Sequence, residues 1–279
     1  MKLMHSPTPI DTHVSDLLRR GFYSMLFQPI RETKTGREIG FEALLRGPKG
    51  SPLARPGTLF SGQSLLSRRL LRRLDLACIG AALRSGRLIP KTQKLFINVH
   101  GDTMSKVAKE ESDLFPLMES LEVAPERIVL EISETTDAAH VKSIARLLSI
   151  FRKLGVQIAL DDVGLRYPWL YHFLHLEPEY IKVDRAFVKN SYCSPRKAIV
   201  LRGLLDMAVN AGALVIAEGI ESEEDWKAIE DIGVHYGQGF WLGRPSAVTG
   251  WTGTDEGCPH PSTLPAFYDA EETLSVKER

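Results

Sequence analysis

Short apolar runs alternate with longer helical patterns along most of this 279-residue chain. The runs are four to nine residues long and rich in Val, Ile, Leu and Phe, which is typical of buried strands. Most are continuously apolar, as strands of a parallel sheet covered on both faces are. We predict strands over residues 22–30, 38–45, 95–99, 127–132, 157–160, 180–183, 214–217 and 239–242.

The segments between the runs carry apolar residues at helical spacing. This spacing predicts helices over residues 64–84, 103–121, 138–154, 195–211 and 222–232. Ser222 is followed by three acidic residues, which is typical of a helix start. Gly155, Gly212 and Gly233 follow helical patterns, at the position where a left-handed residue often ends a helix.

Eight strands that alternate with helices indicate an α/β fold, a (β/α)8 TIM-like barrel. Only residues 31–37 separate the first two strands, and Lys34-Thr35-Gly36 is a turn signal. Seven residues cannot hold a crossover helix, so we expect one strand of the barrel to be antiparallel to its neighbour. We divide the chain into an N-terminal extension (1–20), the barrel domain (21–246) and a partly irregular C-terminal extension (247–279) rich in Gly, Pro, Thr and Ser.

The composition excludes some functions. With 35 basic and 35 acidic residues the formal net charge is zero, which argues against a polymer of nucleic acid as the partner and against a polybasic membrane-surface protein. Three cysteines, Cys78, Cys193 and Cys258, are too few for a disulfide framework. We find no signal peptide and no membrane segment, and we expect a cytoplasmic protein.

Polar residues stand at or near the end of seven of the eight runs. One acid at a strand end is commonly a helix cap or a surface salt bridge, but repetition around the chain is hard to explain in that way. In a barrel these positions converge on the C-terminal rim, where active sites lie. The residues are Glu42, Asn98, Glu131, Asp161, Asp162, Lys182, Asp184, Glu218 and Gln238.

Five carboxylates gathered in one cavity would repel each other and take up protons unless cations compensate them. Carboxylate and amide oxygens without His or Cys favour Mg²⁺ or Mn²⁺ over Zn²⁺. Two such ions about 4 Å apart suit in-line attack on a phosphodiester. Lys182, beside them, could hold the attacking water or help to deprotonate it.

At these residues the chain resembles the EAL domain family, bacterial phosphodiesterases that act on cyclic di-GMP. The resemblance runs from about residue 22 to residue 245, and it rests on ordered motifs. These are Phe27-Gln28-Pro29-Ile30, Phe41-Glu42-Ala43-Leu44-Leu45-Arg46, Phe96-Ile97-Asn98-Val99, Leu130-Glu131-Ile132-Ser133-Glu134, Ile181-Lys182-Val183-Asp184-Arg185, Ala217-Glu218-Gly219-Ile220-Glu221, Tyr236-Gly237-Gln238-Gly239 and Gly243-Arg244-Pro245.

The resemblance implies a metal-dependent hydrolase that opens cyclic di-GMP to linear 5'-pGpG and so lowers the level of this messenger in bacterial signalling and biofilm control. It implies two Mg²⁺ or Mn²⁺ ions, with Ca²⁺ filling the site without supporting chemistry, and a second copy of the domain as partner. The implied metal ligands are Glu42, Asn98, Glu131, Asp161, Asp162 and Glu218. The implied catalytic residues are Lys182, Glu218 and Gln238, and the implied substrate contacts are Gln28, Leu44, Arg46 and Asp184.

One segment departs from the family pattern. After the two aspartates the family usually has Phe-Gly-Thr-Gly-Tyr-Ser-Ser-Leu, and this chain has Val163-Gly164-Leu165-Arg166-Tyr167-Pro168-Trp169-Leu170. Glu134 is implied to stabilise this loop. The departure, at residues 163–169, leaves an alternative open: a weak or inactive EAL domain that acts as a cyclic di-GMP receptor or as a protein-interaction module.

Two histidines follow the divergent loop on a predicted helix. His172 and His175 are three residues apart, and we interpret both as surface residues.

Overall fold

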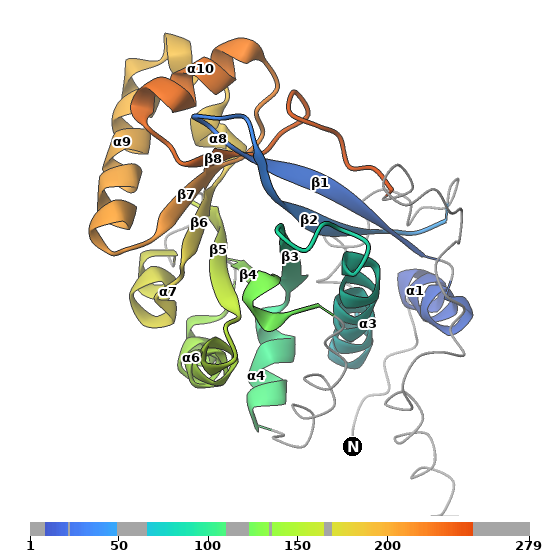
Figure 1. Cartoon of the computed structure of the whole chain (residues 1–279). Helices are drawn as coiled ribbons and strands as arrows, with labels where there is room; N and C mark the ends of the chain where they lie inside the picture. The colour runs from blue at the N-terminus through green and yellow to red at the C-terminus, as the bar shows by residue number, and fades with distance from the viewer. Residues whose placement is uncertain are drawn as a thin grey trace, which may run out of the picture.

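The chain folds into one closed barrel of eight strands, β1 to β8 in chain order, with helices around the outside (Figure 1). The computed structural model describes residues 9–21, 23–48, 66–109, 123–133, 136–164 and 169–247. The strands are β1 (Ser24–Glu32), β2 (Glu38–Arg46), β3 (Lys94–Val99), β4 (Ile128–Ser133), β5 (Gln157–Val163), β6 (Tyr180–Val183), β7 (Leu214–Ala217) and β8 (Tyr236–Gly237). The predicted α/β barrel is confirmed.

The first strand is reversed, as the short connection between the first two runs predicted. β1 pairs antiparallel with β2 on one side and with β8 on the other. Every other neighbouring pair of strands is parallel. Gly36, with a φ of 69°, supplies the left-handed residue of the β1–β2 turn.

The helices are α1 (Pro9–Arg20), α3 (Arg68–Gly86), α4 (Gly101–Lys109), α6 (Ala138–Lys153), α7 (Trp169–Leu176), α8 (Arg185–Val188), α9 (Pro195–Asn210) and α10 (Glu223–Ile232), with short 3₁₀ turns at η4 (Pro125–Arg127) and η5 (Ser191–Cys193). At the start of α10 the Ser222 hydroxyl accepts a hydrogen bond from the Asp225 amide. Gly155, Gly212 and Gly233 all have positive φ, as expected for helix ends. Among the described residues, every helix is too short or too polar to cross a bilayer.

Several boundaries differ from the sequence prediction. The helix expected over 64–84 begins at Arg68, and of the one expected over 103–121 only the part up to Lys109 lies in the described residues. The eighth strand is Tyr236–Gly237 rather than 239–242. Residues 239–243 instead form a turn, closed by hydrogen bonds from the amides of Leu242 and Gly243 to the Gly239 carbonyl. Gly239 packs directly on the backbone of Ile220, which leaves no room for a side chain at residue 239.

The segment before the barrel is part of the packed core. Val14, Leu17 and Leu18 of α1 are buried with the core side chains of α3. The predicted division at residues 20 and 246 stays a prediction.

An apolar layer fills the barrel interior below its C-terminal rim. It is a cluster of six buried side chains from six strands: Ile30, Phe96, Val129, Ala159, Tyr180 and Ile216. Because side chains alternate along a strand, the residue two positions further along each parallel strand also faces inward, one layer nearer the rim. This layer is the floor on which the candidate site lies.

Candidate active site at the barrel rim

The layer above the apolar floor is polar. Two positions beyond the floor residues of β3 to β7 come Asn98, Glu131, Asp161, Lys182 and Glu218. On the reversed β1, Gln28 precedes its floor residue by two and pairs with Glu42 in the β1–β2 ladder. One rule, the alternation of strand side chains, therefore places these residues on one rim.

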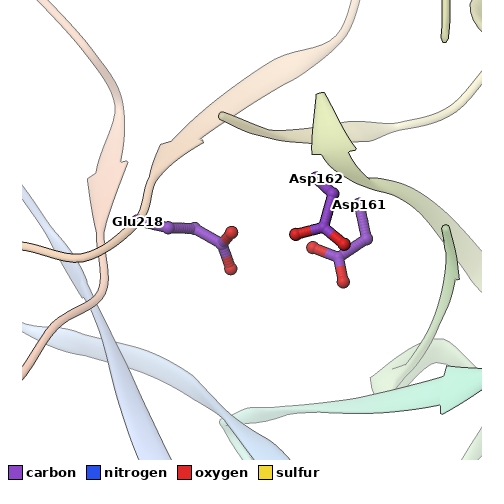
Figure 2. A group of neighbouring side chains, drawn as sticks. All are labelled: Asp161, Asp162 and Glu218. Atoms are coloured by element: carbon purple, nitrogen blue, oxygen red, sulfur yellow. The ribbon is translucent and has the colours of Figure 1, made fainter. Parts of the chain in front are cut away.

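Asp161 and Asp162 are neighbours in sequence, and both contribute to this pocket. The β5–β6 ladder is irregular between Leu160 and Val163, and Asp162 has a left-handed φ of 59°, which aspartate tolerates better than most residues. Figure 2 shows both carboxylates turned toward Glu218; one oxygen of each of the three acids lies within 4.8 Å of the others. β5 runs three residues further than predicted, so an irregular strand, and not a loop, brings the two aspartates together.

Lys182 lies at the centre of the acids. Its side chain is 1% exposed, and its Nζ lies 2.8 Å from Glu218, 2.9 Å from Glu131, 3.2 Å from Asp161 and 3.4 Å from Glu42. Burial alone would lower the pKa of this amine, but the surrounding carboxylates raise it well above its ordinary value. In the metal-free pocket the carboxylates therefore favour the charged form of Lys182, which can hold an anion or a water.

Glu42 is bound on both oxygens by side-chain amides. Asn98 Nδ2 donates to Oε1 and Gln238 Nε2 donates to Oε2, each at 2.7 Å. Burial would raise the pKa of Glu42, but the Lys182 ammonium and these two donors lower it below its ordinary value. Glu42 is consequently held in its charged form.

Glu131 and Glu218 are not stabilised in this way. Burial is the main cause that raises the pKa of Glu131 well above its ordinary value and that of Glu218 to about 8. Repulsion from Asp161 and Glu42 adds to both shifts, and Lys182 opposes them. The single ammonium of Lys182 therefore does not keep all the acids ionised near neutral pH. This agrees with the expectation from the sequence that gathered carboxylates take up protons unless further cations compensate them.

The donor set fits divalent cations. Glu42, Glu131, Asp161, Asp162 and Glu218 carry five negative charges when ionised, and Lys182 carries one positive charge, which leaves −4, the charge that two divalent cations balance. Oε2 of Glu131 is buried and has no hydrogen-bond partner among the described residues, so it is an available ligand atom. Oxygen ligands of this kind suit Mg²⁺ or Mn²⁺.

The residues implied to contact a substrate lie on the same strands. Leu44 and Arg46 follow Glu42 at a spacing of two on β2, so the three side chains project from one face. Leu44 and Arg46 are half-buried, unlike Glu42, and they lie nearer the rim. Their contact with a ligand stays a prediction.

The other two implied contacts already have partners in the protein. Gln28 Nε2 donates to the Gly243 carbonyl at 3.2 Å, and its Oε1 lies 3.4 Å from Gln238 Nε2. Asp184 accepts a hydrogen bond from the Ala186 amide at the start of α8. Glu134 and the centre of the divergent loop, residues 165–168, lie outside the described residues.

The surface interpretation is wrong for one histidine. His175 is exposed, but His172 is completely buried, and its Nε2 lies 2.7 Å from the Thr136 carbonyl oxygen. The sequence held the signal, because a buried helix face repeats at i, i+3, i+4 and i+7. Trp169, His172, Phe173 and Leu176 have this spacing, and all four side chains lie on the core side of α7.

The fold and the pocket define an α/β-barrel protein with an acidic, lysine-centred site at the rim where such barrels hold their functional residues. The EAL domain family matches residues 12–245. The chain belongs to this family.

Curated relatives carry related names. "Probable cyclic di-GMP phosphodiesterase PdeN" of Escherichia coli K12 is 27% identical over 232 residues, which are 82% of this chain and 44% of that protein. "Cyclic di-GMP phosphodiesterase PA2567" of Pseudomonas aeruginosa PAO1 is 29% identical over 235 residues, 81% of this chain and 38% of that protein. The chain thus spans less than half the length of these two relatives.

Solved structures support the same fold. An EAL domain protein from Listeria monocytogenes has a TM-score of 0.74 at 25% identity, over 86% of this chain and 94% of that one. A calcium and cyclic di-GMP complex of BlrP1 from Klebsiella pneumoniae has a TM-score of 0.68 at 25% identity, over 81% of this chain and 56% of that one.

Proposed function

We propose that this protein is a metal-dependent phosphodiesterase that hydrolyses cyclic di-GMP to linear 5'-pGpG. The observation that carries the proposal is the pocket itself: five acids and a buried lysine on a rim whose formal charge matches two divalent cations. The names of the relatives support the substrate.

The proposed ligands of two Mg²⁺ or Mn²⁺ ions are Glu42, Asn98, Glu131, Asp161, Asp162 and Glu218. Asn98 uses Nδ2 to hold Glu42, so its Oδ1 is the atom proposed as ligand. Such ions, when bound, supply positive charge beside the scissile phosphate and lower the pKa of a bound water.

The protein's own residues position the reactants. The Lys182 ammonium, fixed between Glu131 and Glu218, is proposed to hold the attacking water by donating to it. Gln238 keeps Glu42 in place through Oε2. Arg46 is proposed to bind a phosphate of the substrate, because its planar guanidinium can donate to two oxygens at once, and Gln28, Leu44 and Asp184 are proposed as further contacts.

The direct test is incubation of the full chain with cyclic di-GMP and Mg²⁺ or Mn²⁺, followed by chromatography for pGpG. Product that requires the metal and disappears in Glu131→Gln supports the proposal. Glu230→Gln, the same substitution on the exposed face of α10, is the matched control and should keep full activity. Ca²⁺ alone should bind without giving product, and folded protein that gives none with either Mg²⁺ or Mn²⁺ contradicts the proposal.

The alternative function is a cyclic di-GMP receptor or protein-interaction module without useful turnover. The replaced segment 163–169 favours it. It predicts that cyclic di-GMP still binds after chelation of metal and that little pGpG forms. Calorimetry with and without chelator separates the two functions, because nucleotide binding that vanishes with chelator fits the enzyme alone.

The proposed setting is the cytoplasm of a bacterium, where hydrolysis would lower the messenger level in pathways such as biofilm control. Cys78 and Cys193 are free thiols, which suits a reducing compartment.

A homodimer is proposed as the functional assembly, and the exposed face of α9 supports it. Ile199 is 68% exposed, and one turn further on the exposed Gly203 faces open space where a side chain would fit. A glycine inside an exposed helix costs roughly 1 kcal/mol relative to alanine. Because glycine has no side chain, a helix of a second copy can approach closely at Gly203, and this contact would offset the cost.

The same face is self-complementary in charge. Arg196 and Asp206 lie on the stripe with Ile199 and Gly203, all exposed and spaced at three and four residues. If two copies pair antiparallel about residue 201, Arg196 meets the partner's Asp206, and Ile199 meets the partner's Gly203. Arg196→Glu should dissociate the dimer in light scattering, and Arg196→Glu with Asp206→Arg should restore it; a monomeric wild type at all concentrations contradicts the assembly.

A further inference from the structure

The His172 side chain joins two segments that leave neighbouring strands of the pocket. Its ring is completely buried on α7, and Nε2 lies 2.7 Å from the main-chain oxygen of Thr136. A carbonyl oxygen only accepts, so Nε2 carries the proton and donates. The bond spans 36 residues of sequence and links α7, which follows β5, to the segment that follows β4.

Thr136 is bound closely to the acid-bearing end of β4. Its amide donates to the carbonyl of Ser133, the last residue of β4, at 3.1 Å. Ser133 is two residues beyond Glu131 and pairs with Asp161 in the β4–β5 ladder. A shift of Thr136 would therefore act on the point where the strands carrying Glu131 and Asp161 meet at the rim.

A third rim segment packs on the same residue. Gly101, three residues after Asn98, is so close to Thr136 that a Cβ at residue 101 would collide with the threonine side chain. Thr136 thus contacts the segments that follow β3 and β5 as well as β4, and His172 is the side chain that holds its carbonyl from the α7 side.

We propose that His172 is a positioning residue of the metal site: its bond to Thr136 fixes the spacing between Glu131 on β4 and the Asp161–Asp162 pair on β5. This inference rests on the proposed metal site. His172 is proposed to act through the segments that its bond to Thr136 joins. Loss of a direct hydrogen-bond partner of a metal ligand typically weakens metal binding by 10- to 100-fold, and because His172 acts through Thr136 we expect an effect at the lower end of this range.

The test uses the full chain and Mn²⁺ alone, measured by calorimetry without nucleotide. The amide of Gln reaches the position of a histidine Nε2, and that of Asn falls short of it. We expect His172→Gln to bind Mn²⁺ within about threefold of wild type, and His172→Asn and His172→Phe to bind it about 10-fold or more weakly. His175→Asn, on the exposed side of the same helix, is the control and should bind as wild type does.

A second readout separates this inference from the proposed function. Hydrogen exchange should quicken over residues 136–141 in His172→Asn, and it should stay at the wild-type rate in His172→Gln and His175→Asn. Folded His172→Asn that binds Mn²⁺ as tightly as wild type overturns the inference. If the wild type binds no Mn²⁺, the proposed metal site fails as well, whereas the exchange data still show whether the His172 bond holds the segment.

Discussion

The buried lysine gives the sharpest prediction. Lys182→Met keeps the length of the side chain but removes the only ammonium within 3.4 Å of Glu42, Glu131, Asp161 and Glu218 in the described pocket. Removing one partner from a buried ion pair typically costs about 3–5 kcal/mol. For a domain of this size 1 kcal/mol corresponds to roughly 2–4 °C, so we expect the metal-free variant to melt about 6–20 °C below wild type.

The assay is thermal melting by circular dichroism, in chelator and with Mn²⁺. Divalent cations replace the lost positive charge, so Mn²⁺ should raise the melting temperature of Lys182→Met by more than that of wild type. Lys227→Met, which removes a surface lysine paired with Glu223, is the control and should leave the melting temperature unchanged. A metal-free Lys182→Met that melts with wild type would refute the charge balance argued for the pocket.

Three further predictions concern stability. Burial raises the pKa of Asp75 to about 6, so the contribution of Asp75 to the free energy of unfolding is complete below about pH 4 and is lost as the pH rises to about 6. Relative to wild type, the free energy of unfolding of Asp75→Asn should therefore rise by about 3 kcal/mol between these pH values. Denaturation profiles of the two proteins that stay parallel over this range would contradict the prediction. Gly239→Ala would force a Cβ into the Ile220 backbone and should cost roughly 1–3 kcal/mol and reduce turnover, whereas Gly80→Ala, which meets only the end of Arg84, should not destabilise the fold. Mn²⁺ at 100 times its Kd should add about 2.7 kcal/mol per occupied site to the free energy of unfolding of wild type, reversibly with chelator. No shift at millimolar Mn²⁺ would count against a cation site.

Features with local causes could be predicted from the sequence. Strand alternation marks Lys182 as lying one layer above Tyr180, and the seven-residue connection forces the first two strands to be antiparallel. Both rules use only residues that are close in sequence, so the barrel and the residues at its rim could be predicted from them.

Features with tertiary causes could not be predicted. The eighth strand lies before the apolar run that predicted it, and in that run Gly239 packs on the Ile220 backbone, a contact made only after folding. The irregularity that turns Asp162 into the pocket depends on how β5 pairs with β6. The protonation of Lys182 likewise depends on distances to four other strands or strand ends, and no spacing in the sequence gives these distances.

The reversed first strand also decides where the polypeptide enters the barrel. Ser24, the first residue of β1, pairs with Arg46, the last residue of β2, so the incoming chain arrives at the acidic mouth and not at the opposite end. Four residues later the same strand carries Gln28, whose amide contacts Gln238, and Gln238 in turn holds Glu42. A displacement of β1 would therefore reach Glu42 by two routes, the β1–β2 ladder in which Gln28 pairs with Glu42 and the contact from Gln28 through Gln238.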